Sequence, residues 1–257
     1  MRRVTVTMDG PVAHVRLNRP EKMNAVDMEM IDDMLEAGAM LAAAPDLRAV
    51  VLAGKGDAFC AGLDVQSFAM LAGTDPEALV MPRSHGDANR FQHFALVWRS
   101  LPVPVIAALH GAVFGAGFQL ALGADIRIAA PEARLAVMEM KWGLVPDMGG
   151  MVLLPELTRG DVIRQMTYSA APIGAEQAER WGLVTELAAD PLARATALAQ
   201  EIAGKSPSAI RAAKRLIGTA LSGSRAEVLL AESREQADLI GKPDQMAVIA
   251  ANLAARR

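Results

Sequence analysis

The sequence predicts an α/β fold that ends in a purely helical region, and two patterns lead to this prediction. Strand-like and helix-like segments alternate through roughly the first two-thirds of the chain, whereas from Thr158 onward the apolar residues recur at helical spacing. With 257 residues, 52% of them hydrophobic, the chain can fill one large core. We expect residues 1–195 to form that core with the active site, and residues 196–257 to form a C-terminal helical region.

The first predicted elements are a β-hairpin and a helix. Residues 3–8 and 12–17 have strand-like patterns, and the Asp-Gly pair between them is a strong turn signal. Apolar residues at helical spacing predict a helix over 27–43, with Asp27 as its N-cap. Next come a strand, a loop entering a helix, an irregular stretch, a helix, a strand, a short helix and two strands, predicted at 48–53, 59–72, 73–86, 87–101, 103–109, 115–123, 125–130 and 135–137.

From Thr158 onward the predicted segments are helical, and the last quarter of the chain is predicted to contain helices alone. The helical segments are separated by proline and glycine residues, which end helices or begin new ones. The predicted helices are 159–170, 174–181, 191–203, 207–221, 223–239 and 243–253.

Composition and charge exclude several functions. A formal net charge of −3 argues against a protein that binds nucleic acid through its phosphates. The single cysteine, Cys60, excludes an intrachain disulfide and favours a reducing compartment, so we expect a cytoplasmic protein. The N-terminus lacks the apolar segment of a signal peptide, and apolar runs such as 102–109 are too short to span a bilayer, so no membrane partner is expected. The four histidines show no metal-ligand spacing, so no metal site is expected.

Two segments have the pattern of a strand that turns through glycine into a helix. They are residues 57–64 (DAFCAGLD) and 110–119 (HGAVFGAGFQ). Such turns leave backbone N–H groups free at a helix start, and two of them facing each other can hold one carbonyl oxygen in an oxyanion hole. The alternative is that the small residues only allow close packing of a helix on a strand.

A third segment, residues 139–150 (EMKWGLVPDMGG), places two carboxyl groups in apolar surroundings. Burial of Glu139 or Asp147 would raise the pKa of that carboxyl toward neutrality, as a general acid or base requires. The alternative is a pair of exposed loop carboxylates, one of them paired with Lys141.

These three segments, in this order, resemble the crotonase superfamily, the enoyl-CoA hydratase/isomerase family. Three further segments are similar to signatures of that family: 17–25 (LNRPEKMNA), 175–187 (AEQAERWGLVTEL) and 207–214 (PSAIRAAK). The resemblance covers residues 4–220 and implies a crotonase-like spiral of ββα units with a C-terminal helical trimerisation region. It also implies a homotrimer or a hexamer built from two trimers, an acyl-CoA thioester as substrate, and no cofactor beyond that thioester.

The resemblance also implies roles for individual residues. The oxyanion hole would be formed by the backbone N–H groups of Leu63 and Ala116, and the acid/base residues would be Glu139 and Asp147. Substrate-binding positions would be Lys22, Ala61, Gly62, Asp64, Gly115, Gln119 and Trp142. Lys22 is the first candidate for the CoA phosphates, Lys214 and Arg215 are further candidates that would reach a neighbouring subunit's site, and residues 73–86 are expected to cover the acyl pocket.

The reaction expected from these positions is a double-bond shift. Hydratases of the family use two glutamates, and Gln119 replaces the first of them, whereas Glu139 is retained. An amide cannot take a proton from water at neutral pH, so we expect Gln119 to be a hydrogen-bonding spectator. Glu139 would move the proton beside the enolate, and Asp147 would serve the distal carbon or orient Glu139 or water.

Other functions remain open at this stage. The first alternative is an enoyl-CoA hydratase that works with Glu139 alone or with Asp147 as its partner. A hydrolase or dehalogenase with Asp147 as nucleophile is disfavoured because the dehalogenases of the family carry a tryptophan where this chain has Glu139. A non-catalytic acyl-CoA-binding protein is disfavoured by the two retained carboxyl groups.

Overall fold

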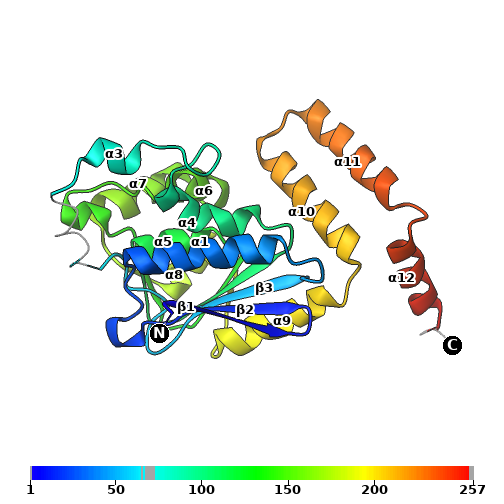
Figure 1. The fold of residues 1–257 in the computed structure, drawn as a ribbon, viewed down its shortest axis with the longest axis horizontal. Coiled ribbons are helices and arrows are strands. Elements are labelled where there is room, and N and C mark those ends of the chain that lie inside the picture. Colours follow the sequence, from blue (N-terminus) through cyan, green and yellow to red (C-terminus); the bar gives the residue numbers. More distant parts are fainter. Residues whose placement is uncertain (1, 65, 67–72, 255–257) are drawn as a thin grey trace.

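The computed structural model describes residues 2–64, 66 and 73–254 (Figure 1). Its strands are β1 (Val4–Asp9), β2 (Val12–Leu17), β3 (Ala49–Gly54), β4 (Val105–Leu109), β5 (Ala112–Phe114), β6 (Ile126–Ala129), β7 (Arg134–Ala136), β8 (Ile173–Gly174) and β9 (Glu186–Leu187). Its α-helices are α1 (Met28–Ala42), α3 (Pro76–Val80), α4 (Arg90–Ser100), α5 (Ala116–Leu122), α6 (Gly150–Leu157), α7 (Gly160–Ser169), α8 (Ala175–Arg180), α9 (Pro191–Ala203), α10 (Pro207–Ser222), α11 (Arg225–Leu239) and α12 (Pro243–Ala254). Two short 3₁₀ helices are η1 (Pro20–Lys22) and η2 (Glu139–Trp142).

The strands form two sheets. The larger sheet has the order β1-β2-β3-β4-β6-β9, in which β1 and β2 form the predicted antiparallel hairpin and the later pairs are parallel. The smaller sheet has the order β5-β7-β8 and begins directly after β4. The chain therefore leaves one sheet and enters the other within the segment that carries the expected oxyanion turn.

The larger sheet is covered on both faces, as its apolar sequence requires. Along β3, Val50 and Leu52 join a large core cluster with α1, α4 and α5, whereas Val51 and Ala53 join a smaller cluster on the other face. The smaller cluster is closed by α9, while α1 lies over the opposite face (Figure 1). All six residues of β3 are buried, which explains why its sequence does not alternate with polar residues.

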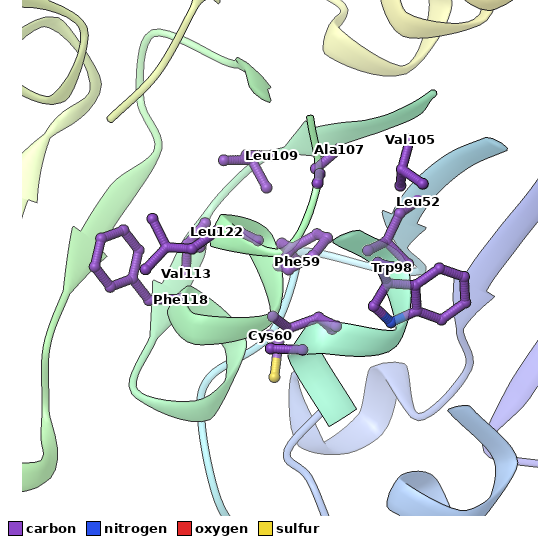
Figure 2. Close-up of a cluster of buried hydrophobic side chains, with 14 of the residues drawn as sticks. Leu52, Phe59, Cys60, Trp98, Val105, Ala107, Leu109, Val113, Phe118 and Leu122 are labelled. Carbon is purple, nitrogen blue, oxygen red and sulfur yellow. The ribbon is translucent and has the colours of Figure 1, made fainter. Parts of the chain in front are cut away.

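The large cluster reaches the segments that hold the predicted site. Figure 2 shows Phe59 and Cys60 from the first turn segment among Trp98 of α4 and Phe118 of α5. These side chains are 0% exposed. The turns that precede α5 and follow β3 are therefore anchored to packed side chains, which favours a fixed geometry at the site.

The C-terminal helices are only loosely joined to this core. Ala212 is the one buried residue of α10 in the described part of the chain, and α11 and α12 contribute none. In Figure 1 these helices stand beside the sheet and not over it. The boundary expected at residue 195 falls inside α9, because Ala195 packs against the sheet together with Ala199 and Ala203. The segment that stands apart from the core begins with α10.

Three local predictions need correction or restriction. Residues 73–86 contain the short helix α3, which begins at an Asp75 cap followed by proline, whereas an irregular stretch was expected. The strands β5, β8 and β9 and the helix α6 were not predicted. The helix expected toward residue 72 falls on positions 65 and 67–72, which lie outside the described residues. No helix among the described residues has the length and apolar character needed to cross a membrane.

Candidate active site

The two glycine-containing turns lie side by side. Cys60 pairs with Val113 as an isolated parallel bridge, in which the Cys60 N–H donates to the Ala112 carbonyl and the Phe114 N–H donates to the Cys60 carbonyl, both at 3.0 Å. Gly62 has a φ of +101°, and a Cβ there would come within 3.1 Å of the Phe114 carbonyl oxygen. Glycine is therefore required by both the backbone conformation and the close approach of the second turn.

Hydrogen bonds from residues 17–25 hold the first turn in place. The buried side-chain amide of Asn24 donates to the carbonyls of Lys55 and Ala58, both at 2.8 Å, and its oxygen accepts from the Arg19 N–H at 2.9 Å. Arg19 itself lies 2.6 Å from the Asp64 carboxylate. Neither Asn24 nor Arg19 was predicted as a site residue. Their signal was the 17–25 signature, which was used only as a mark of resemblance.

The backbone N–H groups of Leu63 and Ala116 border the same cavity. Val26 bonds to Gly62 and Asp64 on either side of Leu63, so the N–H of Leu63 faces away from that bridge and has no backbone acceptor among the described residues. Ala116 is the first residue of α5, where an N–H has no partner within the helix, and the preceding Gly115 supplies no side-chain cap. The structure thus brings together the two expected donors of an oxyanion hole.

The cavity between these turns has a volume of about 360 Å³. Nine of the eleven predicted site residues line it, whereas Gln119 and Asp147 do not. The lining residues are Lys22, Met23, Ala25, Ala61, Gly62, Leu63, Asp64, Gln66, Gly115, Ala116, Met138, Glu139, Lys141 and Trp142. Lys141 is a cation that the prediction did not assign to the substrate, and its Nζ lies 6.0 Å from the centre of the Trp142 ring.

Glu139 begins η2 and is one of two buried carboxyl groups that line the cavity, the other being Asp64. Its side chain is adjacent to the start of α5, because a Cβ on Gly115 would lie 3.5 Å from Glu139 Oε1. Oε1 accepts a hydrogen bond of 2.6 Å from Gln119 Nε2, whereas Oε2 is buried and has no hydrogen-bond partner among the described residues. Burial raises the pKa of the Glu139 carboxyl, and the charge of Asp147 adds to that increase. A raised pKa suits a group that exchanges protons with a substrate.

Gln119 lies behind Glu139 as seen from the cavity. It is 1% exposed on α5, and its Oε1 accepts from the N–H groups of Met148 and Gly150, both at 2.9 Å. The residue thus connects Glu139 to the loop that contains Asp147. It was expected to contact the substrate, but in this chain its contacts are with other parts of the protein.

Asp147 occupies the loop between η2 and α6. Its side chain is exposed, although the surrounding protein still raises the pKa of its carboxyl by desolvation. It is close enough to Glu139 for its charge to raise the pKa of that group. Lys141 forms no ion pair with Asp147 or Glu139, so the alternative of a lysine-paired loop carboxylate is not what the structure has.

The remaining predicted charges are placed as follows. Lys22 is exposed at the cavity. Asp64 accepts from the Gln66 N–H at 2.9 Å, and this bond, together with Arg19, lowers the pKa of its carboxyl. Lys214 is held within the chain by Asp125 at 2.7 Å, and Arg215 is held by Glu235 at 2.6 Å. Among the described residues, no group of three or more His, Cys, Asp or Glu side chains is placed to hold a metal ion.

Comparison with known proteins gives consistent matches over nearly the whole chain. A family model described as enoyl-CoA hydratase/isomerase matches residues 7–251. The carnitinyl-CoA dehydratases of Escherichia coli (strain K12) and Shigella flexneri are each 36% identical over 217 residues, which cover 83% of this chain and 79% of the relative.

Solved structures match equally well. A protein from Mycobacterium abscessus described as an enoyl-CoA hydratase/isomerase superimposes with a TM-score of 0.90 at 31% identity, over 98% of this chain and 96% of its own. A protein from Streptomyces coelicolor A3(2) described as an enoyl-CoA hydratase superimposes with a TM-score of 0.91 at 32% identity, over 100% of this chain and 92% of its own.

Proposed function

The chain belongs to the enoyl-CoA hydratase/isomerase family, and on that premise we propose that it shifts a double bond in an acyl-CoA thioester. Its crotonase-like fold, expected from the sequence, is confirmed by the solved structures that it matches. In the proposed reaction the thioester carbonyl oxygen accepts hydrogen bonds from the N–H groups of Leu63 and Ala116. These donors stabilise the enolate that forms when a proton leaves C2.

Proton transfer is assigned to Glu139. Its carboxylate takes the C2 proton of a 3-enoyl-CoA, and the electron pair of the broken C–H bond is held in the thioester enolate. When the enolate collapses, a C2–C3 double bond forms, the C3–C4 double bond becomes single, and C4 takes up a proton. Glu139 or Asp147 supplies that second proton. Product and substrate have the same composition, so the reaction needs no cofactor beyond the thioester.

One observation carries this proposal. Glu139 lines the cavity, its Oε1 is bonded to the amide of Gln119, and its buried Oε2 has no hydrogen-bond partner among the described residues. A hydratase of the two-glutamate type needs a second carboxylate to hold and deprotonate water. The amide at position 119 cannot take that proton, whereas a proton shift along the acyl chain needs one carboxylate at C2.

A hydro-lyase is the second candidate, and the named relatives favour it. Proteins named carnitinyl-CoA dehydratase are 36% identical to this chain. Loss of water from a 3-hydroxyacyl-CoA also begins with removal of the C2 proton, which Glu139 can accept in the same position. The two candidates differ in the product, since the hydro-lyase interconverts 2-enoyl and 3-hydroxyacyl thioesters.

The assembly proposed for this enzyme is a trimer or a pair of trimers. Large apolar side chains are exposed along α10–α12, including Leu229, Ile240 and Ile249, and a neighbouring subunit would cover them. The lone cysteine is buried, which is compatible with a reducing compartment such as the cytoplasm.

The test is a product assay in D₂O. Purified protein is incubated with 2-enoyl-, 3-enoyl-, 3,5-dienoyl- and 3-hydroxyacyl-CoA of several chain lengths, and products and deuterium are read by mass spectrometry. Isomer formation without 3-hydroxy product supports the proposal. Rapid interconversion of 2-enoyl- and 3-hydroxyacyl-CoA would replace it by the hydro-lyase.

The assignment of Glu139 is tested in the same assay. Glu139→Gln is expected to lower turnover by about 10²–10⁴-fold, as loss of a general acid or base does, while acyl-CoA binding remains. Glu132→Gln is the matched control, because Glu132 is exposed and does not line the cavity. Unchanged turnover in Glu139→Gln would remove Glu139 from the mechanism.

A further inference from the structure

The orientation of the Gln119 amide is determined by its surroundings. Two backbone N–H groups, those of Met148 and Gly150, point at the same side-chain atom at 2.9 Å. That atom must be the oxygen, because a side-chain NH₂ would set donor against donor. Nε2 therefore faces Glu139 Oε1, at 2.6 Å, and it must be a donor there.

Packing removes the freedom to change this arrangement. Gln119 lies on α5, whose seven residues are all buried. A Cβ on Gly150 would lie 2.8 Å from Gln119 Cγ, so any larger residue at position 150 would clash with the glutamine side chain. The start of α6 therefore closes one side of the space around the Gln119 side chain.

The two carboxylate oxygens of Glu139 differ in their hydrogen bonding. Oε1 is engaged by Gln119 Nε2, and Oε2 remains as the unpartnered atom of a residue that lines the cavity. A hydrogen bond donated to a carboxylate favours its ionised form, and here it opposes the effect of burial. The bond from Gln119 therefore limits the increase in the pKa of Glu139 that burial causes, and it fixes the orientation of the carboxyl group through Oε1.

We propose that Gln119 is a positioning residue that sets the reaction of this site: it fixes the carboxyl group of Glu139 through Oε1, couples Glu139 to the loop of Asp147, and occupies with a neutral amide the position from which a glutamate would contact Glu139. The inference deepens the proposed function and rests on it where Glu139 is taken as the acid/base. A glutamate at position 119 would retain the acceptor for Met148 and Gly150 but would bring a second carboxylate oxygen against Glu139. Two carboxylates in such contact must share a proton.

Gln119→Glu separates the two roles of the amide. It preserves the acceptor that holds the loop and removes only the donor to Glu139. Isomerisation is measured against pH in the variant, in the wild type and in Gln165→Glu, which places the same change on an exposed side chain of α7. We expect the acidic limb of kcat to move upward by about 1–3 pH units in Gln119→Glu, with a smaller change in KM and an unchanged circular dichroism spectrum. Gln165→Glu should match the wild type.

A second readout does not depend on turnover. The infrared band of the protonated Glu139 carboxyl is assigned as the band that disappears in Glu139→Gln, and it is titrated in the wild type and in Gln119→Glu. An upward shift of the midpoint in the folded variant supports the inference. An unchanged midpoint in a folded Gln119→Glu overturns it, whatever reaction the enzyme catalyses. If the wild type forms no isomer from any substrate, the proposed function fails, and the titration still decides the role of Gln119.

Discussion

Arg19 Nη1 lies 2.6 Å from Asp64 Oδ2, and this contact joins the segment after β2 to the segment that supplies the Leu63 amide. The same guanidinium donates to the Ala25 carbonyl at 3.0 Å and lies 3.4 Å from Asp27. Both members of the pair have side chains no more than 10% exposed. The position of one proposed oxyanion donor therefore depends on an ion pair outside the reacting groups.

Arg19→Met is expected to lower both stability and turnover. The substitution leaves the Asp64 carboxylate beside the cavity without its main cation, and an unsatisfied buried group of this kind costs about 1–3 kcal/mol of unfolding free energy. Arg2→Met is the control, since Arg2 and Glu36 form an exposed pair at 3.6 Å whose loss changes stability by less than about 1 kcal/mol. Denaturant unfolding and kcat measure the two effects. Equal stability of both variants would show that the Arg19–Asp64 pair is not structural.

The Asp147→Asn variant distinguishes the proton-transfer role of Asp147 from that of Glu139. If Asp147 returns the proton at the distal carbon, the variant should lose about 10²–10⁴-fold in isomerisation, whereas Glu139 continues to exchange the C2 hydrogen. Deuterium uptake at C2 and isomer formation are followed together by mass spectrometry. Asp46→Asn, at an exposed position of the α1–β3 connection, is the control. Retained isomerisation in Asp147→Asn would assign both proton transfers to Glu139.

The buried carboxyl of Glu139 should make stability depend on pH. Its pKa is raised by burial, so the folded protein binds more protons than the unfolded chain between the unfolded and folded pKa values. The free energy of unfolding contributed by Glu139 therefore falls as pH rises through this window, and the loss is complete above the folded pKa. Glu139→Gln removes the titration, so its advantage over the wild type should grow from mildly acidic to mildly alkaline pH. Thermal unfolding across that range measures it, and an advantage that shrinks with rising pH would contradict the expected sign.

Gly62→Ala should damage the first turn. The residue has a φ of +101°, and a Cβ would lie 3.1 Å from the Phe114 carbonyl oxygen, so we expect a strain of about 1–3 kcal/mol. Displacement of the adjacent Leu63 N–H should lower kcat by an amount approaching the loss of one oxyanion donor, about 3 kcal/mol. Gly73→Ala is the control, since a Cβ there meets no atom within 4 Å. Wild-type turnover in Gly62→Ala would show that the turn tolerates a side chain.

Cys60 should be unreactive in the native enzyme. Burial raises the pKa of its thiol to about 12, and its Sγ lies 3.1 Å from the Asn24 carbonyl oxygen. Alkylation at neutral pH should therefore proceed only as fast as the protein unfolds, because the thiolate is the reactive form. Mass spectrometry of native and denatured samples provides the comparison. Rapid labelling of a protein with native circular dichroism would contradict the burial of this turn.

Local sequence patterns predicted the elements whose signals lie within one segment. The β1–β2 hairpin follows from the Asp-Gly turn, and α1 follows from its apolar spacing and the Asp27 cap, whose side chain accepts from the Met30 N–H. β5 and α6 were missed for a physical reason. β5 has only three residues and exists because β7, far along the chain, pairs with it, and α6 begins at two glycines that favour a break by local propensity.

Residue types and their spacing were enough to predict the family resemblance, the glycines of both turns and the proton-transfer candidates. The role of Gln119 follows from contacts made in the folded chain. Its amide is oriented by two N–H groups about thirty residues away in sequence, and no local pattern encodes that contact. The same is true of Lys214, which sequence reasoning offered to CoA and which the fold engages with Asp125 and the Val103 carbonyl. Residue types set which interactions are possible, and packing of distant segments selects which of them are made.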